Sequence, residues 1–323
     1  MPPLVDLPLD ELRVYRPPLT KQPDFDTFWE ETLAAAARIP LDPALEPTNY
    51  PARRVQVYRA SYNGWDGARI TGWYLVPTQR EGPLPALVQY HGYSWWSGEP
   101  HNYLAWALQG YAVLAVDVRG QSGRSDDPTP YPGGHVRGWM TMGIRSPHTY
   151  YYRGAYVDSV RALDFLETRD EVDMQRVGVM GLSQGGGLSL AVAALDARPK
   201  LAMPEVPYLC HFRRALDMAQ KDPYLEFAEY LKRYPKEEES LFRTVSYFDC
   251  MNLAPRVHCP VLMTVGLQDV ICPPSTIFAA FNHLGSAVKE MAVYPYHGHE
   301  VVEAHWEDKI RWANRYLWSE GTS

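Results

Sequence analysis

The sequence predicts an α/β fold in which helices cover a mostly parallel, doubly wound sheet. Two observations predict it. From residue 86 onward, short apolar runs typical of strands buried on both faces alternate with segments of helical periodicity. The 323 residues are 46% hydrophobic and 21% charged, which supplies enough apolar side chain for a large core. We expect a single domain over residues 1–323, with an N-terminal extension over 1–50 and a helical insertion over about 210–250.

The first elements are a helix and a hairpin. Residues 24–38 are rich in alanine and predict a helix, with Asp24 or Asp26 as its N-terminal cap. A proline-rich stretch follows. Residues 53–62 and 68–77 then alternate between apolar and polar side chains, which is typical of an antiparallel hairpin.

The remaining elements alternate in type along the chain. Gly110 favours an end for the helix before it, and residues 154–168 have apolar side chains on one helical face. The charged stretch 210–250 is too long for an ordinary loop, and we interpret it as a lid or an assembly surface. The predicted strands are 86–92, 111–120, 176–181, 201–209, 260–266 and 290–296, and the predicted helices are 99–110, 154–168, a segment after Ser183, 275–285 and 305–318.

Composition excludes several classes of function. The net charge is −7 and no run of five basic residues occurs, so we expect no nucleic-acid partner. The four cysteines lack the spacing of a zinc site, which favours free thiols in a reducing compartment and no metal. The N-terminus has no signal-peptide pattern and no long apolar segment occurs, so we expect a cytoplasmic protein without a membrane partner.

Polar side chains with complementary chemistry follow three of the predicted strands. Ser183 lies within a Gly-x-Ser-x-Gly pattern between a strand and a helix, Asp269 follows the strand 260–266, and His297 and His299 follow the strand 290–296. The order Ser, Asp, His is that of the α/β-hydrolase fold. Position alone does not separate His297 from His299. The alternatives are an ordinary turn at Ser183 and a helix N-cap at Asp269.

These residue types suit acyl transfer. A serine hydroxyl is a weak nucleophile until a histidine removes its proton, and a carboxylate holds that histidine in the required tautomer. The oxyanion then needs two N–H donors, and the pattern points to the backbone N–H groups of Gln184 and Tyr93. No cofactor is needed for this chemistry.

Other polar and aromatic residues have two interpretations each. We expect His91 to be structural, and Arg119 and Gln121 to brace the loops of the site. Three tryptophans either line an acyl or sugar pocket or fill the core: Trp95, Trp96 and Trp106.

Several motifs together resemble the cephalosporin C deacetylase / acetyl xylan esterase family. They are HGY at 91–93, RGQ at 119–121, GLSQGGG at 181–187 and YPYHGHE at 294–300. The resemblance covers nearly the whole chain. It implies an α/β hydrolase that removes acetyl groups from small substrates, including acetylated xylo-oligosaccharides and cephalosporin C, and that assembles as a hexamer.

The resemblance also assigns roles. It makes Ser183 the nucleophile, Asp269 the acid of the triad and His299 the base, because His299 precedes Glu300 as in the family's His-Glu motif. It places the oxyanion donors at Tyr93 and Gln184. Tyr93 and Trp106 are the expected substrate contacts.

The chain departs from the family pattern at two places. Residues 301–306, VVEAHW, replace the glycines expected after the His-Glu motif. Trp95 with Trp96 replaces smaller residues, which predicts a narrower pocket mouth.

The alternatives to an acetyl esterase are a serine peptidase, a carbon–carbon hydrolase, or a non-catalytic binding scaffold on the same fold. Aromatic residues of the 24–38 helix lie outside a minimal hydrolase core, so we expect them to need a partner surface: Phe25, Phe28 and Trp29.

Overall fold

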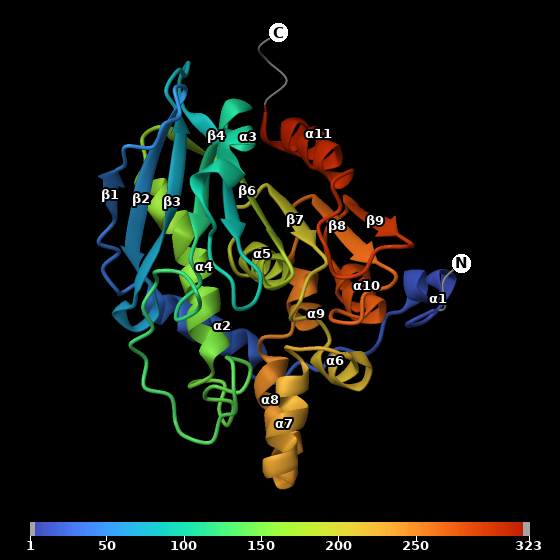
Figure 1. The fold of residues 1–323 in the computed structure, drawn as a ribbon. Coiled ribbons are helices and arrows are strands. Elements are labelled where there is room, and N and C mark those ends of the chain that lie inside the picture. Colours follow the sequence, from blue (N-terminus) through green and yellow to red (C-terminus); the bar gives the residue numbers. More distant parts are fainter. Residues whose placement is uncertain (1–3, 319–323) are drawn as a thin grey trace.

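The centre of the molecule is one twisted sheet of nine strands in the order β1-β2-β3-β5-β4-β6-β7-β8-β9 (Figure 1). The computed structural model describes residues 4–318. The strands are β1 (Ala44–Pro47), β2 (Val55–Asn63), β3 (Arg69–Pro77), β4 (Leu84–Tyr90), β5 (Ala112–Val116), β6 (Val172–Leu182), β7 (Leu201–Glu205), β8 (Val261–Gly266) and β9 (Lys289–Tyr294).

The pairing of the strands changes once across the sheet, from antiparallel to parallel. β1, β2, β3 and β5 pair antiparallel in succession. From β5 through β4, β6, β7 and β8 to β9 every pairing is parallel. The predicted mostly parallel sheet and the predicted hairpin are therefore confirmed. Because the parallel strands all end at one edge, side chains that follow them meet there.

Helices cover both faces of the sheet, and each face has its own apolar core. Along β4, Val88 packs in the larger core with α4 and α5, and Leu87 packs in the smaller core with α3 and α11 (Figure 1). The α-helices are α1 (Leu9–Val14), α2 (Phe25–Ala36), α3 (Leu104–Leu108), α4 (Tyr151–Glu167), α5 (Gln184–Leu195), α6 (Phe212–Met218), α7 (Leu225–Arg233), α8 (Glu238–Ser246), α9 (Cys250–Leu253), α10 (Pro274–His283) and α11 (His305–Leu317). The short 3₁₀ turns are η1 (Trp65–Gly67), η2 (Pro100–Tyr103), η3 (Pro235–Glu237) and η4 (Ala254–Arg256).

The aromatic residues of α2 bury themselves inside their own chain. Phe28 packs against Tyr247 with ring centroids 4.8 Å apart, and the Trp29 indole N–H donates to the Tyr247 carbonyl over 2.9 Å. Phe25 is buried beside them. The expectation that these side chains need a partner surface is wrong, because the segment 247–248 supplies the contact.

Some local predictions differ from the structure. The predicted helix 99–110 is a 3₁₀ turn, η2, followed by the short helix α3, with Gly110 in the left-handed region after it. Asp24 occupies the N-cap of α2, but its carboxylate accepts from the Tyr247 hydroxyl rather than from a backbone N–H. The strand β1 lies in the proline-rich stretch, where the sequence pattern predicts none.

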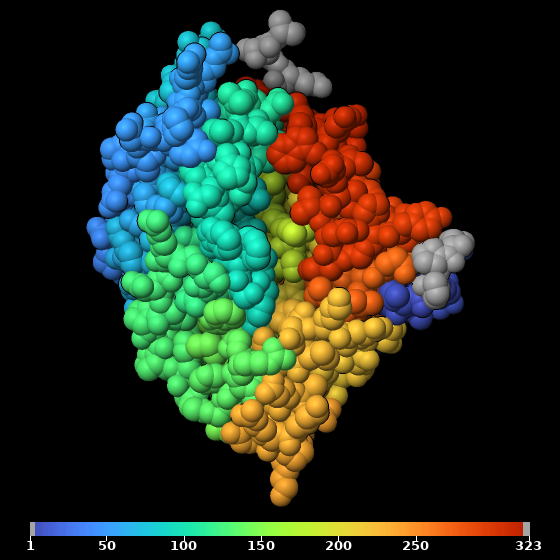
Figure 2. Space-filling view, in the orientation of Figure 1, coloured from blue at the N-terminus to red at the C-terminus, as the bar shows by residue number. Residues whose placement is uncertain are grey.

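The stretch 210–250 holds the helices α6, α7 and α8. Figure 2 shows this gold segment projecting from the body at the bottom of the view. The same view shows a furrow between the teal segment that includes α3 and the red C-terminal segment. Among residues 4–318, no helix combines the length and the apolar character needed to cross a membrane.

Candidate active site

Three polar side chains meet at the carboxyl edge of the parallel strands. Ser183 follows β6, Asp269 follows β8 and His299 follows β9. The His299 Nε2 lies 2.8 Å from the Ser183 Oγ, and the His299 Nδ1 lies 2.7 Å from the Asp269 Oδ2. The structure thus brings together the three residues predicted from the sequence, in a single hydrogen-bonded row.

The backbone at Ser183 is strained, and glycines make the strain possible. Ser183 has φ 59° and ψ −116°, a conformation that side-chain-bearing residues rarely adopt. A Cβ atom on Gly185 would lie 2.0 Å from the Tyr90 carbonyl oxygen, and one on Gly181 would lie 2.5 Å from the same atom. The strand and the helix can therefore meet at a sharp angle that only glycine permits at these two positions.

Backbone hydrogen bonds hold the turn in place. The Ser183 N–H donates to the Glu205 carbonyl at the end of β7 over 2.8 Å. The Ser183 carbonyl accepts from the N–H groups of Gly187 and Tyr208. Ser183 is 8% exposed, so its hydroxyl reaches solvent only through the opening of the site.

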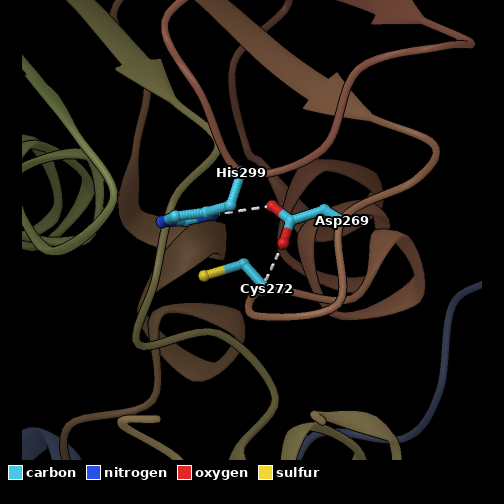
Figure 3. Close-up of side chains that lie close together, drawn as sticks. All are labelled: Asp269, Cys272 and His299. Carbon is cyan, nitrogen blue, oxygen red and sulfur yellow. Dashed lines mark hydrogen bonds and ion pairs between the residues drawn. The ribbon is translucent and has the colours of Figure 1, made fainter. Parts of the chain in front are cut away.

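The partners of Asp269 fix the tautomer of His299. The Asp269 side chain is buried, and its Oδ1 accepts from the backbone N–H groups of Ile271 and Cys272, each over 2.8 Å. The other oxygen faces the His299 Nδ1 (Figure 3). A carboxylate in this position makes Nδ1 the protonated nitrogen, so Nε2 is free to accept the Ser183 proton.

His297 lies outside this row. Its ring packs edge-on against Tyr294 with centroids 5.6 Å apart, and its carbonyl accepts from the Gln268 N–H. The geometry therefore separates the two histidines, which position in the sequence did not.

Cys272 is a neighbour of this row that the sequence analysis missed. Asp269, Cys272 and His299 offer ligand atoms that lie within 4.8 Å of one another (Figure 3), the donor types of a thiophilic metal. Both nitrogens of His299 and both oxygens of Asp269 already have protein partners. Burial also raises the pKa of the Cys272 thiol far above its ordinary value, which disfavours the thiolate that a metal needs. A metal ion here would have to displace the contacts of the row.

Two backbone N–H groups beside Ser183 are available for an oxyanion. Gln184 is the first residue of α5, where N–H groups lack intrahelical acceptors. A Cβ atom on Gly92 would lie 3.9 Å from the Ser183 Cβ, which places the neighbouring Tyr93 close to the hydroxyl. Within residues 4–318, neither the Tyr93 N–H nor the Gln184 N–H donates a hydrogen bond to another protein group.

Side-chain amides brace both of these segments. The Gln121 Oε1 accepts from the Ser94 N–H over 2.9 Å, and its Nε2 donates to the Gln184 Oε1 over 2.9 Å. Tyr152 donates its hydroxyl to the same Gln184 oxygen. Gln121 therefore fixes the loop after β4 relative to the start of α5, in the bracing role expected for it.

Arg119 and His91 also have structural partners. Arg119 is fully buried and pairs with Asp158 over 2.6 Å, behind the loop that carries Gln121. The His91 Nε2 accepts from the Val118 N–H, and its Nδ1 donates to the Gly92 carbonyl. Burial lowers the pKa of His91, which keeps the ring neutral in this position.

A cavity of about 690 Å³ opens beside Ser183 and His299. Tyr93, Trp95 and Ile271 line it, so two of the predicted aromatic residues reach the site. Trp106 does not. It is buried in the core between the sheet, α3 and α11, where its ring lies 4.8 Å from that of Trp306, and it leaves no face for a substrate. The assignment of Trp106 to substrate binding is therefore wrong, because α3 packs Trp106 into the smaller core on one face of the sheet, away from the Ser183 cavity.

The far wall of the cavity carries a buried carboxylate that the sequence analysis also missed. Glu226 of α7 accepts from the Tyr93 hydroxyl over 2.8 Å and from the Met140 N–H over 3.1 Å. The Tyr93 hydroxyl in turn accepts from the backbone N–H of Trp139. Burial raises the pKa of Glu226 to about 7, although these donors act in the opposite direction. In the sequence, Glu226 looks like one more charged residue of an amphipathic helix.

Comparisons with known proteins give a consistent result. The family model described as acetyl xylan esterase matches residues 2–316. The curated acetyl esterase Axe7A of Xylanibacter ruminicola is 29% identical over 314 residues, which is 93% of this chain and 67% of that protein.

Two solved structures are similar over their full length. An acetyl xylan esterase from Paenibacillus sp. R4 is 47% identical with a TM-score of 0.94, and the match covers 96% of this chain and 100% of that one. Acetyl Xylan Esterase 1 from Thermoanaerobacterium sp. is 36% identical with a TM-score of 0.93, over 97% of this chain and 100% of that one. These likenesses confirm the predicted α/β-hydrolase fold.

Proposed function

This chain belongs to the acetyl xylan esterase family and is an acetyl esterase, and we propose that it works through a covalent acetyl intermediate on Ser183. The observation that carries the proposal is the hydrogen-bonded row from Ser183 through His299 to Asp269, at the end of an open cavity. Such a row supports acyl transfer because each member supplies what the next one needs.

In the first step, the Ser183 oxygen attacks the carbonyl carbon of the acetyl group while His299 Nε2 takes the hydroxyl proton. Asp269 stabilises the positive charge that forms on the imidazole, and two backbone N–H groups hold its carboxylate in position. The N–H groups of Tyr93 and Gln184 receive the oxyanion. Removing one such donor typically costs about 3 kcal/mol of transition-state stabilisation.

The tetrahedral intermediate then collapses. The bond to the alcohol oxygen breaks, and His299 returns its proton to that oxygen. The deacetylated sugar therefore leaves with a neutral hydroxyl group. Water enters the vacated position and attacks the acetyl-serine with His299 as base. Acetate departs and the Ser183 hydroxyl is restored, which completes the cycle.

We infer small acetylated substrates, with acetylated xylo-oligosaccharides and cephalosporin C as the chemical classes. Two of the most similar structures carry the name acetyl xylan esterase, and the family resemblance of the sequence adds cephalosporin C. The cavity of about 690 Å³ suits a small ester group with part of its alcohol. On the same resemblance we propose a homohexamer that acts in the cytoplasm.

Acyl size tests this function. We compare chromogenic acetate, butyrate and octanoate esters with a chromogenic peptide amide, and use Ser183→Ala as the control. Because Tyr93 and Trp95 confine the space beside Ser183, activity should fall steeply from acetate to butyrate and vanish with octanoate. Equal rates on acetate and octanoate would remove the deacetylase assignment, and preference for the amide would favour a peptidase.

Light scattering after size exclusion tests the assembly. A particle of six chains supports the proposed hexamer, whereas a particle of one chain excludes it. The result leaves the chemistry at Ser183 unaffected, because all three residues of the row come from a single chain.

A further inference from the structure

Two neighbouring indoles form an exposed ridge beside the cavity. Trp95 is 57% exposed and Trp96 is 38% exposed, and their rings stack with centroids 4.8 Å apart at an angle of 23°. Trp95 lines the cavity that holds Ser183. Trp96 lines a second hollow of about 320 Å³, which we call the Trp96 hollow. The ridge therefore separates the Ser183 cavity from an adjoining polar depression.

The ridge is fixed in position. The Ser122 hydroxyl donates to the Ser94 carbonyl over 2.8 Å, and the Ser122 N–H donates to the Trp95 carbonyl over 3.2 Å. Because Gln121 also accepts from the Ser94 N–H, the ridge is tied to the same segment that braces the proposed oxyanion donors. A ligand that stacks on it meets a surface already held in place.

The Trp96 hollow is lined by hydrogen-bonding groups that lack partners. The Arg59 guanidinium lies flat on the Trp73 ring, 3.3 Å from its centroid. In the part of the chain that the structure describes, neither Arg59 nor Arg124 forms an ion pair or donates a side-chain hydrogen bond. The exposed carboxylate of Glu99 lies in the same lining.

One buried hydroxyl in this lining is unsatisfied. Ser97 is 3% exposed, and its Oγ has no hydrogen-bond partner among residues 4–318. A buried hydroxyl usually has a partner, because leaving it unpaired costs free energy. The Ser97 Oγ itself is closed off from solvent, so the groups that the hollow presents to a ligand are an aromatic face, guanidinium donors and a carboxylate acceptor.

We propose that the Trp96 hollow is a second sugar-binding subsite, which holds a pyranose ring of the same oligosaccharide whose acetyl group lies at Ser183. The inference rests on the proposed function for its substrate class. An indole face packs against the C–H face of a pyranose, and the ring hydroxyls bind to donors and acceptors around its edge. The chain of the oligosaccharide crosses the ridge, with one ring on each side.

The chemistry of the lining favours a sugar over an apolar protein partner. Charged and polar side chains occupy most of the positions around Trp96. The ridge is also continuous with the Ser183 cavity through Trp95. An apolar partner would cover the indoles and leave these polar groups unpaired.

Substrate length tests the subsite. We measure kcat/KM on acetylated xylobiose and acetylated xylohexaose and take the long-to-short ratio for the parent, for Trp96→Ala, and for Leu108→Ala as a matched control at another exposed apolar residue. Loss of the stacking face should lower the ratio about threefold to tenfold in Trp96→Ala. The control should keep the parent ratio. An unchanged ratio in Trp96→Ala overturns the subsite.

Binding of non-acetylated xylohexaose separates the subsite from the reaction. Calorimetric titration of the active protein should give a Kd that rises about threefold to tenfold in Trp96→Ala. Equal Kd values in the parent and Trp96→Ala overturn the subsite even if the esterase activity is as proposed. A Trp96-dependent Kd supports the subsite even if no acetylated xylo-oligosaccharide is hydrolysed.

Light scattering on the same variants completes the test. If Trp96→Ala changes the number of chains in the particle, the ridge is an interface between copies and the proposal is overturned. An unchanged particle with a lowered length ratio supports it.

Discussion

The two walls of the Ser183 cavity are built in opposite ways. The wall that carries Ser183 comes from consecutive residues, 181–187, and is held by glycines and backbone hydrogen bonds. The wall that faces it joins segments from three parts of the chain, and the side chains of Tyr93 and Glu226 connect them. The nucleophile is thus fixed by local backbone geometry, whereas the shape of the space around the substrate is fixed by long-range side-chain contacts.

This difference predicts that changes on the first wall abolish the reaction and that changes on the second wall adjust it. The largest effect is expected for Ser183→Ala, which removes the nucleophile. Activity on a chromogenic acetate ester should fall by a factor of about 10⁴ or more. A serine-directed phosphonate should label the parent on the peptide that contains Ser183. Residual turnover within tenfold of the parent would show that another group attacks the ester.

The two histidines extend the comparison to the side chains that lie beside Ser183. His299→Ala should be as damaging as Ser183→Ala, because residues of one row act as a unit. His297→Ala should be much milder, since His297 contacts Tyr294 rather than Ser183. Steady-state kinetics on the acetate ester measures both. The opposite order of damage would make His297 the base.

On the second wall, Glu226→Ala should lower kcat/KM for the acetate ester by about tenfold, because the Tyr93 hydroxyl and the Met140 N–H lose their buried acceptor. The loss should fall mainly on kcat, since Tyr93 carries a proposed oxyanion donor. Glu226→Gln keeps one acceptor oxygen and should recover most of the activity. If both variants lose activity equally, the carboxylate acts on the substrate directly.

The smallest effect is a change in the pH dependence of stability. Burial raises the pKa of Glu226 to about 7 from an ordinary value of 4.5. The folded chain therefore holds this proton more tightly than the unfolded chain, so the contribution of Glu226 to stability is full below about pH 4.5 and is lost as the pH rises through about 7. Glu226→Gln removes this loss.

Thermal unfolding of the parent and of Glu226→Gln between about pH 5 and pH 8 measures it. The melting temperature of the variant relative to the parent should rise with pH over this range. A constant difference across the range would mean that the Glu226 carboxyl titrates at its ordinary pKa in the folded chain.

The same contrast explains what could be predicted from the sequence. The strand-turn-helix around Ser183 follows from residues that are neighbours in the chain, because glycine spacing and apolar runs report local backbone geometry. The placement of Asp269 and of the pair His297 and His299 follows from the parallel sheet, since they come after strands, and the family resemblance selects His299 from the pair. These positions needed no knowledge of how distant segments pack.

The residues that were missed depend on distant contacts. Glu226 is buried only because the segment 137–140 folds over it: Gly138 approaches so closely that a Cβ atom there would clash with the carboxylate. Trp106 was misplaced because an indole in a short amphipathic helix gives no sign of which face of the sheet it packs against. Cys272 lies next to the row through a turn after β8 that has no distinctive spacing.

The contact between α7 and the segment 137–140 has a consequence for how the sequence of this protein can change. Arg137 forms ion pairs with Asp222 and Glu229, and Glu226 is shielded by Gly138. A change of either segment alone would remove the close contact that shields the Glu226 carboxylate. We therefore expect substitutions in the two stretches to be coupled, so that a change in what the enzyme accepts needs paired changes in both while the residues around Ser183 stay constant.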